Sequence, residues 1–357
     1  MENTSTTTPV PAELTVGIDV SDKYSQVCIL DGLGEVMEES RVRTTEAALR
    51  IRFSSLRPAR TVIEVGPHSP WLSRLLRGLG HECIVANPRR LRLIADSTRK
   101  NDRADAETLA RVGRADPSLL APVEHRSEQA QADLALIHSR RLLVESRTSL
   151  VNRVRAVAKS FGARLPASGA RAFAQKVTAH IPDQLRPATA PLLRQIVHLN
   201  EEIADLDRQI EALIKQSYPQ ARLLQQVPGV GPLIALAYVL TIGEPQRFPK
   251  SRHVGAYLGL VPRERSSGDS RPELSITKSG NVYMRQLLVN GAHYILGHFG
   301  ADSDLRRWGL RKAEGGKSAK KRAVIAVARK LAVLLHRLWA TGEVYTALSA
   351  KEVTAAA

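Results

Sequence analysis

The sequence contains few cysteines and no pattern that would bind a metal through thiolates. Only two of its 357 residues are cysteines, and Cys28 and Cys83 lie in separate apolar segments without the short spacing of metal ligands. A disulfide framework and a cysteine-ligated zinc site are therefore not expected. We predict two buried thiols in a reducing compartment.

Long hydrophobic runs are also missing. No run approaches the roughly 18–20 apolar residues of a membrane-spanning helix, and the polar N-terminus lacks the apolar stretch of a signal peptide. We therefore expect a cytoplasmic protein with no membrane partner.

Acidic residues are the third deficit. The chain has 52 Lys and Arg against 35 Asp and Glu, which gives a formal net charge of +17. Such a surface attracts polyanions, because each cation that meets a phosphate releases a counterion. Hydrophobic residues make up 43% of the chain, enough for ordinary globular cores. Nucleic acid is thus the expected partner.

Residues 13–115 have the periodicity of an α/β domain. Three strand-like segments, 14–20, 24–30 and 35–44, are joined by short turns and predict an antiparallel meander. A helix at 46–56 follows, and then two strand-like segments alternate with helical ones, which predicts parallel pairing through crossovers. This order, β-β-β-α-β-α-β-α, resembles the ribonuclease H-like fold.

The remainder is predicted to be mainly helical. A helix is expected over 127–161, and Ile and Leu alternate at coiled-coil spacing from Ile196 to Leu213. That seam fits an antiparallel hairpin within one subunit as well as it fits a dimer contact. We predict a flexible N-terminus (1–12), the α/β domain (13–125), a helical spacer (126–218), a mainly helical C-terminal domain (219–345) and a flexible tail (346–357).

Four acids stand out in this basic chain. Asp19 and Glu64 lie near the ends of two predicted strands, while Asp102 and Asp105 are three residues apart and share one face of a predicted helix. If that helix packs beside the sheet edge, their mutual repulsion would require hard cations, and Mg²⁺ in a single-metal or two-metal site suits phosphodiester cleavage. Taken singly, Asp102 is also a plausible helix N-cap and Asp105 a first-turn dipole partner. The neighbouring Arg99, Lys100 and Arg103 would meet phosphates.

Two segments further along predict contacts with nucleic acid. The turn at "VPGVGP", with Gly229 and Gly231, resembles the phosphate grip of a helix-hairpin-helix, although an ordinary helix start explains it nearly as well. Residues 257–292 hold a polar loop with Ser266 and Ser267, which is either a nucleophile site or a Ser-Gly loop touching phosphates. The cations expected around the attacked phosphate are Arg263, Arg265, Arg271, Lys278 and Arg285. A run of eight Lys and Arg over 306–322 predicts a further backbone contact rather than a merely solvated face.

Together these segments resemble a known family. "VGIDVSDK", "TVIEVG", "KNDRADAETLARVG", "VPGVGPLIALAYVLTIGEPQRFPKSRHVGAYLGLVPRERSSG" and "ITKSGNVYMRQLLVNGA" are similar to the DEDD transposases of the insertion sequence 110 family, in the family's order over about residues 13–295. The resemblance implies an N-terminal RuvC-like domain whose four acids fall on Asp19, Glu64, Asp102 and Asp105. It also implies a C-terminal transposase domain with a serine nucleophile.

Further expectations come from the resemblance alone. The nucleophile is expected at Ser266, with Ser267 as the fallback, because the family's motif reads Ser-(Ser/Thr)-Gly. The family's loop often continues Gly-Gly-Lys, whereas "GDSR" follows here, so the basic contact is expected at Arg271. The implied partners are donor and target DNA, a bridge RNA that guides the enzyme, and further copies of the chain, as a dimer or a dimer of dimers.

Two other functions fit the same residues. A two-metal junction endonuclease would use water as the nucleophile and leave the serine idle. A non-catalytic DNA- or RNA-binding protein would use only the glycine turn and the basic run.

Overall fold

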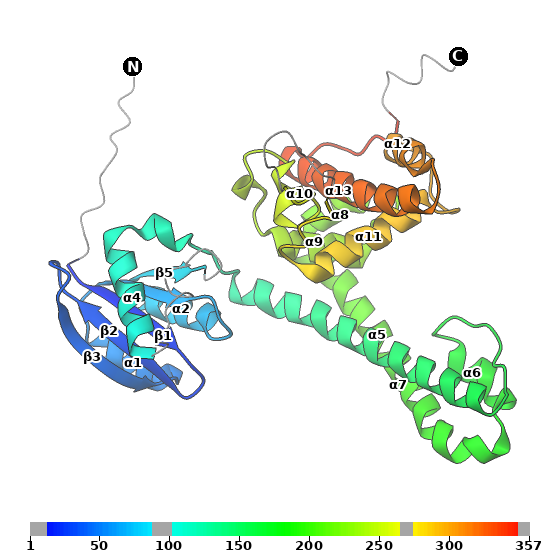
Figure 1. Ribbon diagram of the computed structural model, residues 1–357, viewed down its shortest axis with the longest axis horizontal. Coiled ribbons are helices and arrows are strands. Elements are labelled where there is room, and N and C mark those ends of the chain that lie inside the picture. Colours follow the sequence, from blue (N-terminus) through cyan, green and yellow to red (C-terminus); the bar gives the residue numbers. More distant parts are fainter. Residues whose placement is uncertain (1–12, 88–101, 265–273, 349–357) are drawn as a thin grey trace. The chain divides into compact units, whose positions relative to one another are not determined.

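The computed structural model describes residues 13–87, 102–264 and 274–348, in two compact units (Figure 1). The first unit comprises Met1–Glu128 and the second Gln129–Ala357. We describe each unit by itself.

A five-stranded sheet forms the centre of the N-terminal unit. Its strands are β1 (Thr15–Val20), β2 (Tyr24–Leu30), β3 (Val36–Arg43), β4 (Arg60–Glu64) and β5 (Glu82–Ala86), in the order β3-β2-β1-β4-β5. The first three strands are antiparallel, and β4 and β5 run parallel to β1. The predicted α/β sheet domain is thus confirmed.

Alternate residues of the central strands face different helices. Val16 and Ile18 pack with α1 (Glu46–Ser54) and α2 (Ser69–Gly78) on one face of the sheet. Cys28 and Leu30 meet α4 (Asp102–Ala115) on the other face. Both cysteines are free and buried, as predicted, and burial raises the pKa of each thiol to about 11.

Helix α4 lies unusually close to the sheet. A Cβ added to Gly17 of β1 would be 1.9 Å from the Ala106 carbonyl oxygen, and one added to Gly113 would be 2.3 Å from Cγ2 of Val62. The carbonyl of Gly113 accepts a hydrogen bond from Arg60, the first residue of β4 (3.3 Å). Helix α4 therefore runs antiparallel to β1 and β4, and its N-terminus lies at their carboxyl ends.

The C-terminal unit contains a long helical hairpin. Helices α5 (Glu128–Ser160) and α7 (Arg186–Gln216) run side by side in opposite directions (Figure 1), with α6 (Phe173–Val177) between them in the chain. Arg140 of α5 binds Asp207 of α7 at 2.5 Å, and Arg147 donates to Asn200 at 2.8 Å. The isoleucines of the heptad seam are buried within the chain, which fits the intramolecular alternative. They are Ile196, Ile203 and Ile210.

The rest of this unit is a helical bundle. Its helices are α8 (Pro219–Leu224), α9 (Pro232–Ile242), α10 (His253–Tyr257), α11 (Val282–Leu296), α12 (Asp304–Ala313) and α13 (Lys317–Thr341). Helix α9 is buried from Ala235 to Ile242, and the hydroxyl of its Tyr238 donates to the carbonyl of Ala332 in α13 (2.7 Å). Within the described ranges, we find no helix with the length and apolarity needed to cross a bilayer.

Candidate functional site

The sheet positions the first two of the four acids side by side. Asp19 lies two residues beyond Gly17, and Glu64 two residues beyond Val62, so both side chains lie on the α4 face of the sheet. Ile18 pairs with Ile63, which makes Asp19 and Glu64 neighbours at the next position of two parallel strands. Adjacent strands are about 4.8 Å apart. The two carboxylates therefore lie at the carboxyl edge of β1 and β4.

Helix α4 brings the other two acids to the same edge. Its buried residues, Ala106 and Leu109 among them, form the stripe that faces the sheet. Asp102 and Asp105 precede these two residues by one turn each, so they extend the stripe toward the carboxyl edge of the sheet.

Electrostatics connect Asp19 to the other three acids. The pKa of Asp19 is raised from 3.8 to about 6, first because its carboxyl group is partly buried and then because Asp102, Asp105 and Glu64 repel its charged form. A backbone hydrogen bond from Val20 opposes this shift. All three of the other acids thus oppose the ionisation of Asp19.

Carboxylate oxygens are the ligands that Mg²⁺ prefers, and the repulsion at this edge is what a divalent cation would relieve. The chemistry of the donors therefore fits such an ion. In the described part of the chain, however, no three or more His, Cys, Asp or Glu side chains are grouped closely enough to hold a metal. The four acids are coupled across the site without being gathered on one point.

A polar network beside these acids was not predicted from the sequence. The indole N–H of Trp71 donates to Nδ1 of His68 (3.1 Å), which places the ring proton on Nε2, and Nε2 then donates to Asp22 (3.1 Å). His68 follows β4 and Asp22 follows β1, so the network ties together the loops that leave the two acid-bearing strands. The sequence did offer one sign of this network, because His68 and Asp22 each follow closely after a predicted strand.

The predicted glycine turn joins α8 to α9. Gly229 has φ +87° and packs so closely that a Cβ would be 3.0 Å from the carbonyl oxygen of Gly291. Gly231 is the N-cap of α9, where no side chain caps the first-turn N–H groups. The turn thus leaves backbone donors at a helix N-terminus, as phosphate binding requires.

Both candidate serines lie outside the described residues. The same holds for four of the predicted cations, which are Arg99, Lys100, Arg265 and Arg271. The two chain segments that lead to the serines are described, and we call them the stem. They comprise residues 259–264 and 274–280.

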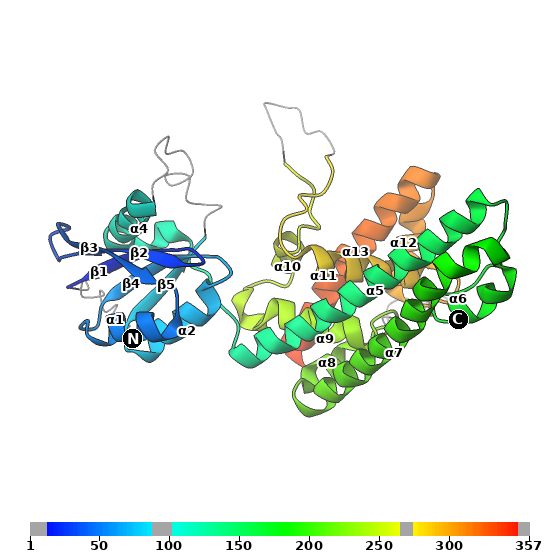
Figure 2. The same cartoon turned by 90° about the horizontal axis from the view of Figure 1, so that it is seen from below.

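The stem is a short β-like ladder (Figure 2). Pro262 bridges Ile276, the N–H of Arg263 donates to Ser275 (3.0 Å), and the N–H of Thr277 donates to Val261 (2.9 Å). These bonds hold the two arms side by side at the two ends of the segment that contains Ser266 and Ser267.

Two glycines hold the base of the stem. A Cβ on Gly280 would lie 2.1 Å from the carbonyl oxygen of Tyr257, and one on Gly259 would lie 2.3 Å from that of Ser279. Lys278, two residues before Gly280, has φ +57° and an exposed side chain. Arg263 is also exposed, as is Arg103 on α4. These three cations can reach a phosphate from solvent.

The structure gives Arg285 a different role from the predicted one. Its residue is only 8% exposed, and its guanidinium donates to the carbonyls of Leu258 (3.1 Å) and Ser279. The side chain therefore links α11 to one arm of the stem, through Ser279, and to Leu258, the residue that precedes the other arm, and this burial does not fit the predicted phosphate contact. Part of the basic run is used in the same way, because Arg306 donates to the carbonyls of Ile295 and Gly297 at the end of α11.

Comparisons with known proteins agree with these features. A family model for DEDD transposases of the IS110 type matches residues 16–162, and the model described as Transposase IS116/IS110/IS902 family matches residues 221–306. The chain is 30% identical to the transposase for insertion sequence element IS1111A of Coxiella burnetii, over 92% of this chain and 90% of that protein. It is 31% identical to a probable family 20 transposase of Pseudomonas aeruginosa, over 82% and 87%. It is also 27% identical to the pilin gene-inverting protein of Moraxella bovis, over 72% of each. The chain therefore belongs to the IS110 family of DEDD transposases and is the transposase of an insertion sequence.

Proposed function

We propose that this transposase cuts and rejoins DNA with a serine nucleophile and a Mg²⁺-binding acidic tetrad. The observation that carries the proposal is the raised pKa of Asp19, to which Glu64, Asp102 and Asp105 all contribute. Acids from two strands and a helix influence one another at a single sheet edge, and such clusters of perturbed carboxylates are typical of catalytic sites.

The N-terminal unit is proposed to be RuvC-like. Support comes from its strand order, in which an antiparallel meander is followed by two parallel strands. Asp19, Glu64, Asp102 and Asp105 would hold the Mg²⁺, in a one-metal or two-metal site. When bound, the ion supplies charge stabilisation at the phosphate that is cut. Exposed Arg103 would bind a neighbouring phosphate and orient the strand.

The serine is proposed to make the covalent bond to DNA. The hydroxyl of Ser266, or of Ser267, would lose its proton to solvent as its oxygen bonds to phosphorus. The bond from phosphorus to the leaving DNA oxygen would break, and that oxygen would take up a proton; rejoining reverses the step. Arg263, Arg265, Arg271 and Lys278 would stabilise the charge that develops on the phosphate. Arg285 would act by holding the stem.

The remaining assignments rest on the family. The guide would be a bridge RNA, the substrates donor and target DNA, and the assembly a dimer or a dimer of dimers. The three proposed parts are the RuvC-like domain (13–125), the helical spacer (126–218) and the transposase domain (219–345), with 1–12 and 346–357 as tails. In the last of these the α8–α9 turn would grip a phosphate as a helix-hairpin-helix does, through the donors at Gly229 and Gly231.

Trapping the covalent intermediate tests the serine. The full-length protein is incubated with guide RNA, Mg²⁺ and labelled element DNA, and protein–DNA adducts are separated on a denaturing gel. Ser266→Ala should abolish the adduct, or Ser267→Ala should if that residue is the nucleophile. Ser160→Ala, an exposed serine at the end of α5, is the control and should leave the adduct unchanged.

The same gel separates this mechanism from its rival. A water-using endonuclease would still cut DNA after both serine substitutions and would give no adduct in the unaltered protein. Replacing Asp19 and Asp102 together with Asn should stop cutting under either mechanism, while DNA remains bound.

A further inference from the structure

A long groove runs along α13 in the C-terminal unit. Its volume is about 1370 Å³, and its walls come from α12, α13, the stem and the segment that follows α13. Aliphatic side chains line its floor, among them Ile325 and Leu334 of α13 and Leu305 of α12. The volume exceeds the range of about 300–1000 Å³ that is usual for small-molecule sites. We call it the α13 groove.

Cations line the walls of the α13 groove. Seven of its lining residues are Lys or Arg, and the one carboxylate among them is Asp304. The pKa of Lys330 is lowered, first by burial and then by the nearby charges of Arg311 and Lys312. Like charges held close together at the edge of an apolar groove favour an anionic occupant.

Two aromatic rings also line the groove. Trp308 of α12 contributes one, and Nζ of Lys330 lies 3.9 Å from the centre of its ring. Tyr345 contributes the other. In a chain with only 4% aromatic residues, two rings beside clustered cations are a distinctive combination.

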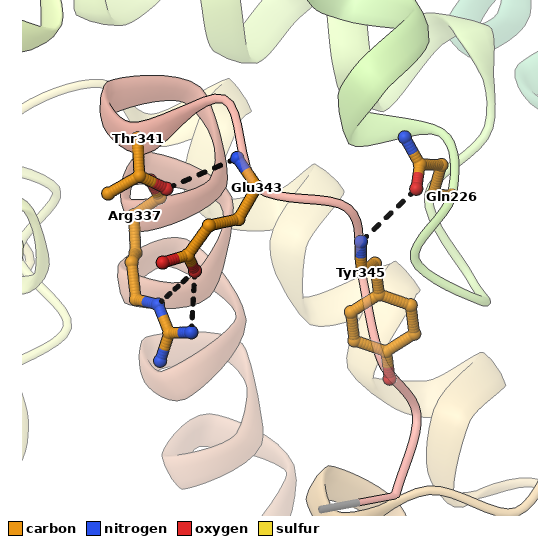
Figure 3. A network of polar contacts seen from close by, with 5 residues as sticks. All are labelled: Gln226, Arg337, Thr341, Glu343 and Tyr345. Atoms are coloured by element: carbon orange, nitrogen blue, oxygen red, sulfur yellow. Dashed lines mark hydrogen bonds and ion pairs between the residues drawn. The ribbon is translucent and has the colours of Figure 1, made fainter.

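The segment that carries Tyr345 is tied down on both sides (Figure 3). The N–H of Tyr345 donates to the side-chain oxygen of Gln226 (3.1 Å), and Glu343 accepts two hydrogen bonds from Arg337 of α13 (2.7 and 3.0 Å). The N–H of Asp304 donates to the carbonyl of Ala347 (2.8 Å). This wall is therefore held in place by contacts with three other elements.

Both arms of the stem also line the groove. Pro262 comes from one arm, and Leu274 and Ile276 come from the other. Pro262 precedes the segment that carries the candidate serines by a few residues in the chain, so the stem joins the lining of the groove to that segment.

We infer that the α13 groove binds an unpaired nucleic-acid strand, with its bases on the apolar floor and its phosphates on the cationic walls. Single-strand sites combine a positive groove with rings on which bases stack, whereas a duplex keeps its bases hidden from an apolar floor. This inference rests on the proposed function, because it says that the enzyme holds part of its nucleic acid as an unpaired strand. An acidic amphipathic protein segment is the competing occupant and becomes an outcome of the test.

Binding is measured with full-length protein in EDTA, so that no strand is cut. The probes are fluorescein-labelled dT12, U12 and a DNA hairpin of equal charge, and the readout is anisotropy at several salt concentrations. Lys321 lines the groove, while its exposed neighbour Lys320 does not, and the two form a matched pair. Lys321→Gln should weaken binding of the unpaired probes about threefold or more and lower the salt slope by about 0.7, as loss of one phosphate contact does. Lys320→Gln should change neither by as much.

Trp308 tests the stacking independently. Trp308→Leu keeps an apolar side chain but removes the ring, so dT12 or U12 should bind at least about fivefold more weakly, with little change for the hairpin. Trp308→Phe should restore most of the affinity. If Trp308→Leu weakens binding of dT12 more than binding of U12, the occupant is DNA. If it weakens binding of U12 more, the occupant is RNA.

Equal effects of Lys320→Gln and Lys321→Gln, or unchanged binding in folded Trp308→Leu protein, would overturn the inference. So would groove variants that bind both probes normally but change the oligomeric mass in light scattering, since the occupant would then be protein. If Trp308→Leu does not fold, the lysine pair decides alone. The adduct gel tests the serine separately, so loss of the adduct with normal groove behaviour refutes the proposed chemistry and not the groove.

Discussion

Replacing Asp19 with asparagine should make the metal-free protein more stable at neutral pH. The pKa of this carboxyl group is about 6 in the folded chain and 3.8 in the unfolded one. Below pH 3.8 the group is protonated in both states and has no effect. As the pH rises from about 4 to 6, the unfolded chain loses its proton first, so the ionised group progressively destabilises the fold. Above pH 6 this penalty is complete.

The size of the effect follows from the shift. Two pKa units correspond to about 3 kcal/mol, and partial exposure of the carboxyl group reduces this to about 1–2 kcal/mol. Asp19→Asn removes the charge and keeps the shape. We therefore expect the variant to be about 1–2 kcal/mol more stable than the unaltered protein at pH 8 in EDTA, and equally stable near pH 4.

Native-state hydrogen exchange of peptides that cover β1 measures the stability of the N-terminal unit, without contributions from the C-terminal unit. Adding Mg²⁺ should slow exchange in the unaltered protein and have much less effect in Asp19→Asn. Glu39→Gln is the control, because Glu39 is an exposed acid on β3 of the same unit, and it should reproduce the unaltered protein. Exchange at pH 8 that is equal or faster in Asp19→Asn would refute the electrostatic coupling of the four acids.

Three further predictions concern how the parts are held. Gly17→Ala should lower the stability of the N-terminal unit in thermal unfolding by about 3 kcal/mol or more, because the added Cβ would overlap the backbone of α4. Gly78→Ala is the control and should be neutral or slightly stabilising, because its Cβ would have no described atom within 4 Å. Arg285→Gln should cost about 1.5–3 kcal/mol and speed proteolysis of the stem, because a buried charged donor to two carbonyls is lost; cleavage at wild-type rates would refute its structural role. Ile203→Ala should destabilise the α5–α7 hairpin by about 2–4 kcal/mol in urea unfolding, whereas Val197→Ala, at a residue that is 46% exposed, should cost far less.

Local sequence patterns were enough to predict most strands and helices, but not which of their residues pack against one another. The apolar run "LTVGIDV" predicted a strand, and the structure forms β1 over Thr15–Val20. The same stretch gave no sign that Gly17 would lie against Ala106, because that contact joins segments far apart in the chain. A glycine in a strand is only a general hint of close approach.

The candidate site shows the same division. An acid in so apolar a strand made Asp19 conspicuous, and its coupling to the other three required the folded structure. Arg285 was assigned to the surface because of its charge. Its spacing from Leu288, Ala292 and Ile295 places it on the buried stripe of α11, and that periodicity was a readable sign of its structural role.

Among the described cations, two sets can be distinguished that composition cannot separate. Arg285 and Arg306 are tied to backbone carbonyls and fix the stem and the end of α11. Lys278 and Lys321 are exposed, and both line the α13 groove. Counting charge predicts that nucleic acid binds, but only the second set can meet a phosphate.

The four acids at the carboxyl edge of β1 and β4 raise a different question, because their charges repel one another and do not favour placing them at one edge. Repulsion among four carboxylates would relax if α4 slid or tilted away from the sheet. Gly17 and Gly113 oppose this, since at each of them α4 packs against the sheet so closely that a Cβ would overlap its neighbours. Tight packing at the middle and end of α4 thus keeps Asp102 and Asp105 at the edge of the sheet that carries Asp19, and a cation bound there would relieve the repulsion. A larger residue at position 17 should accordingly weaken Mg²⁺ binding even though it touches none of the four acids.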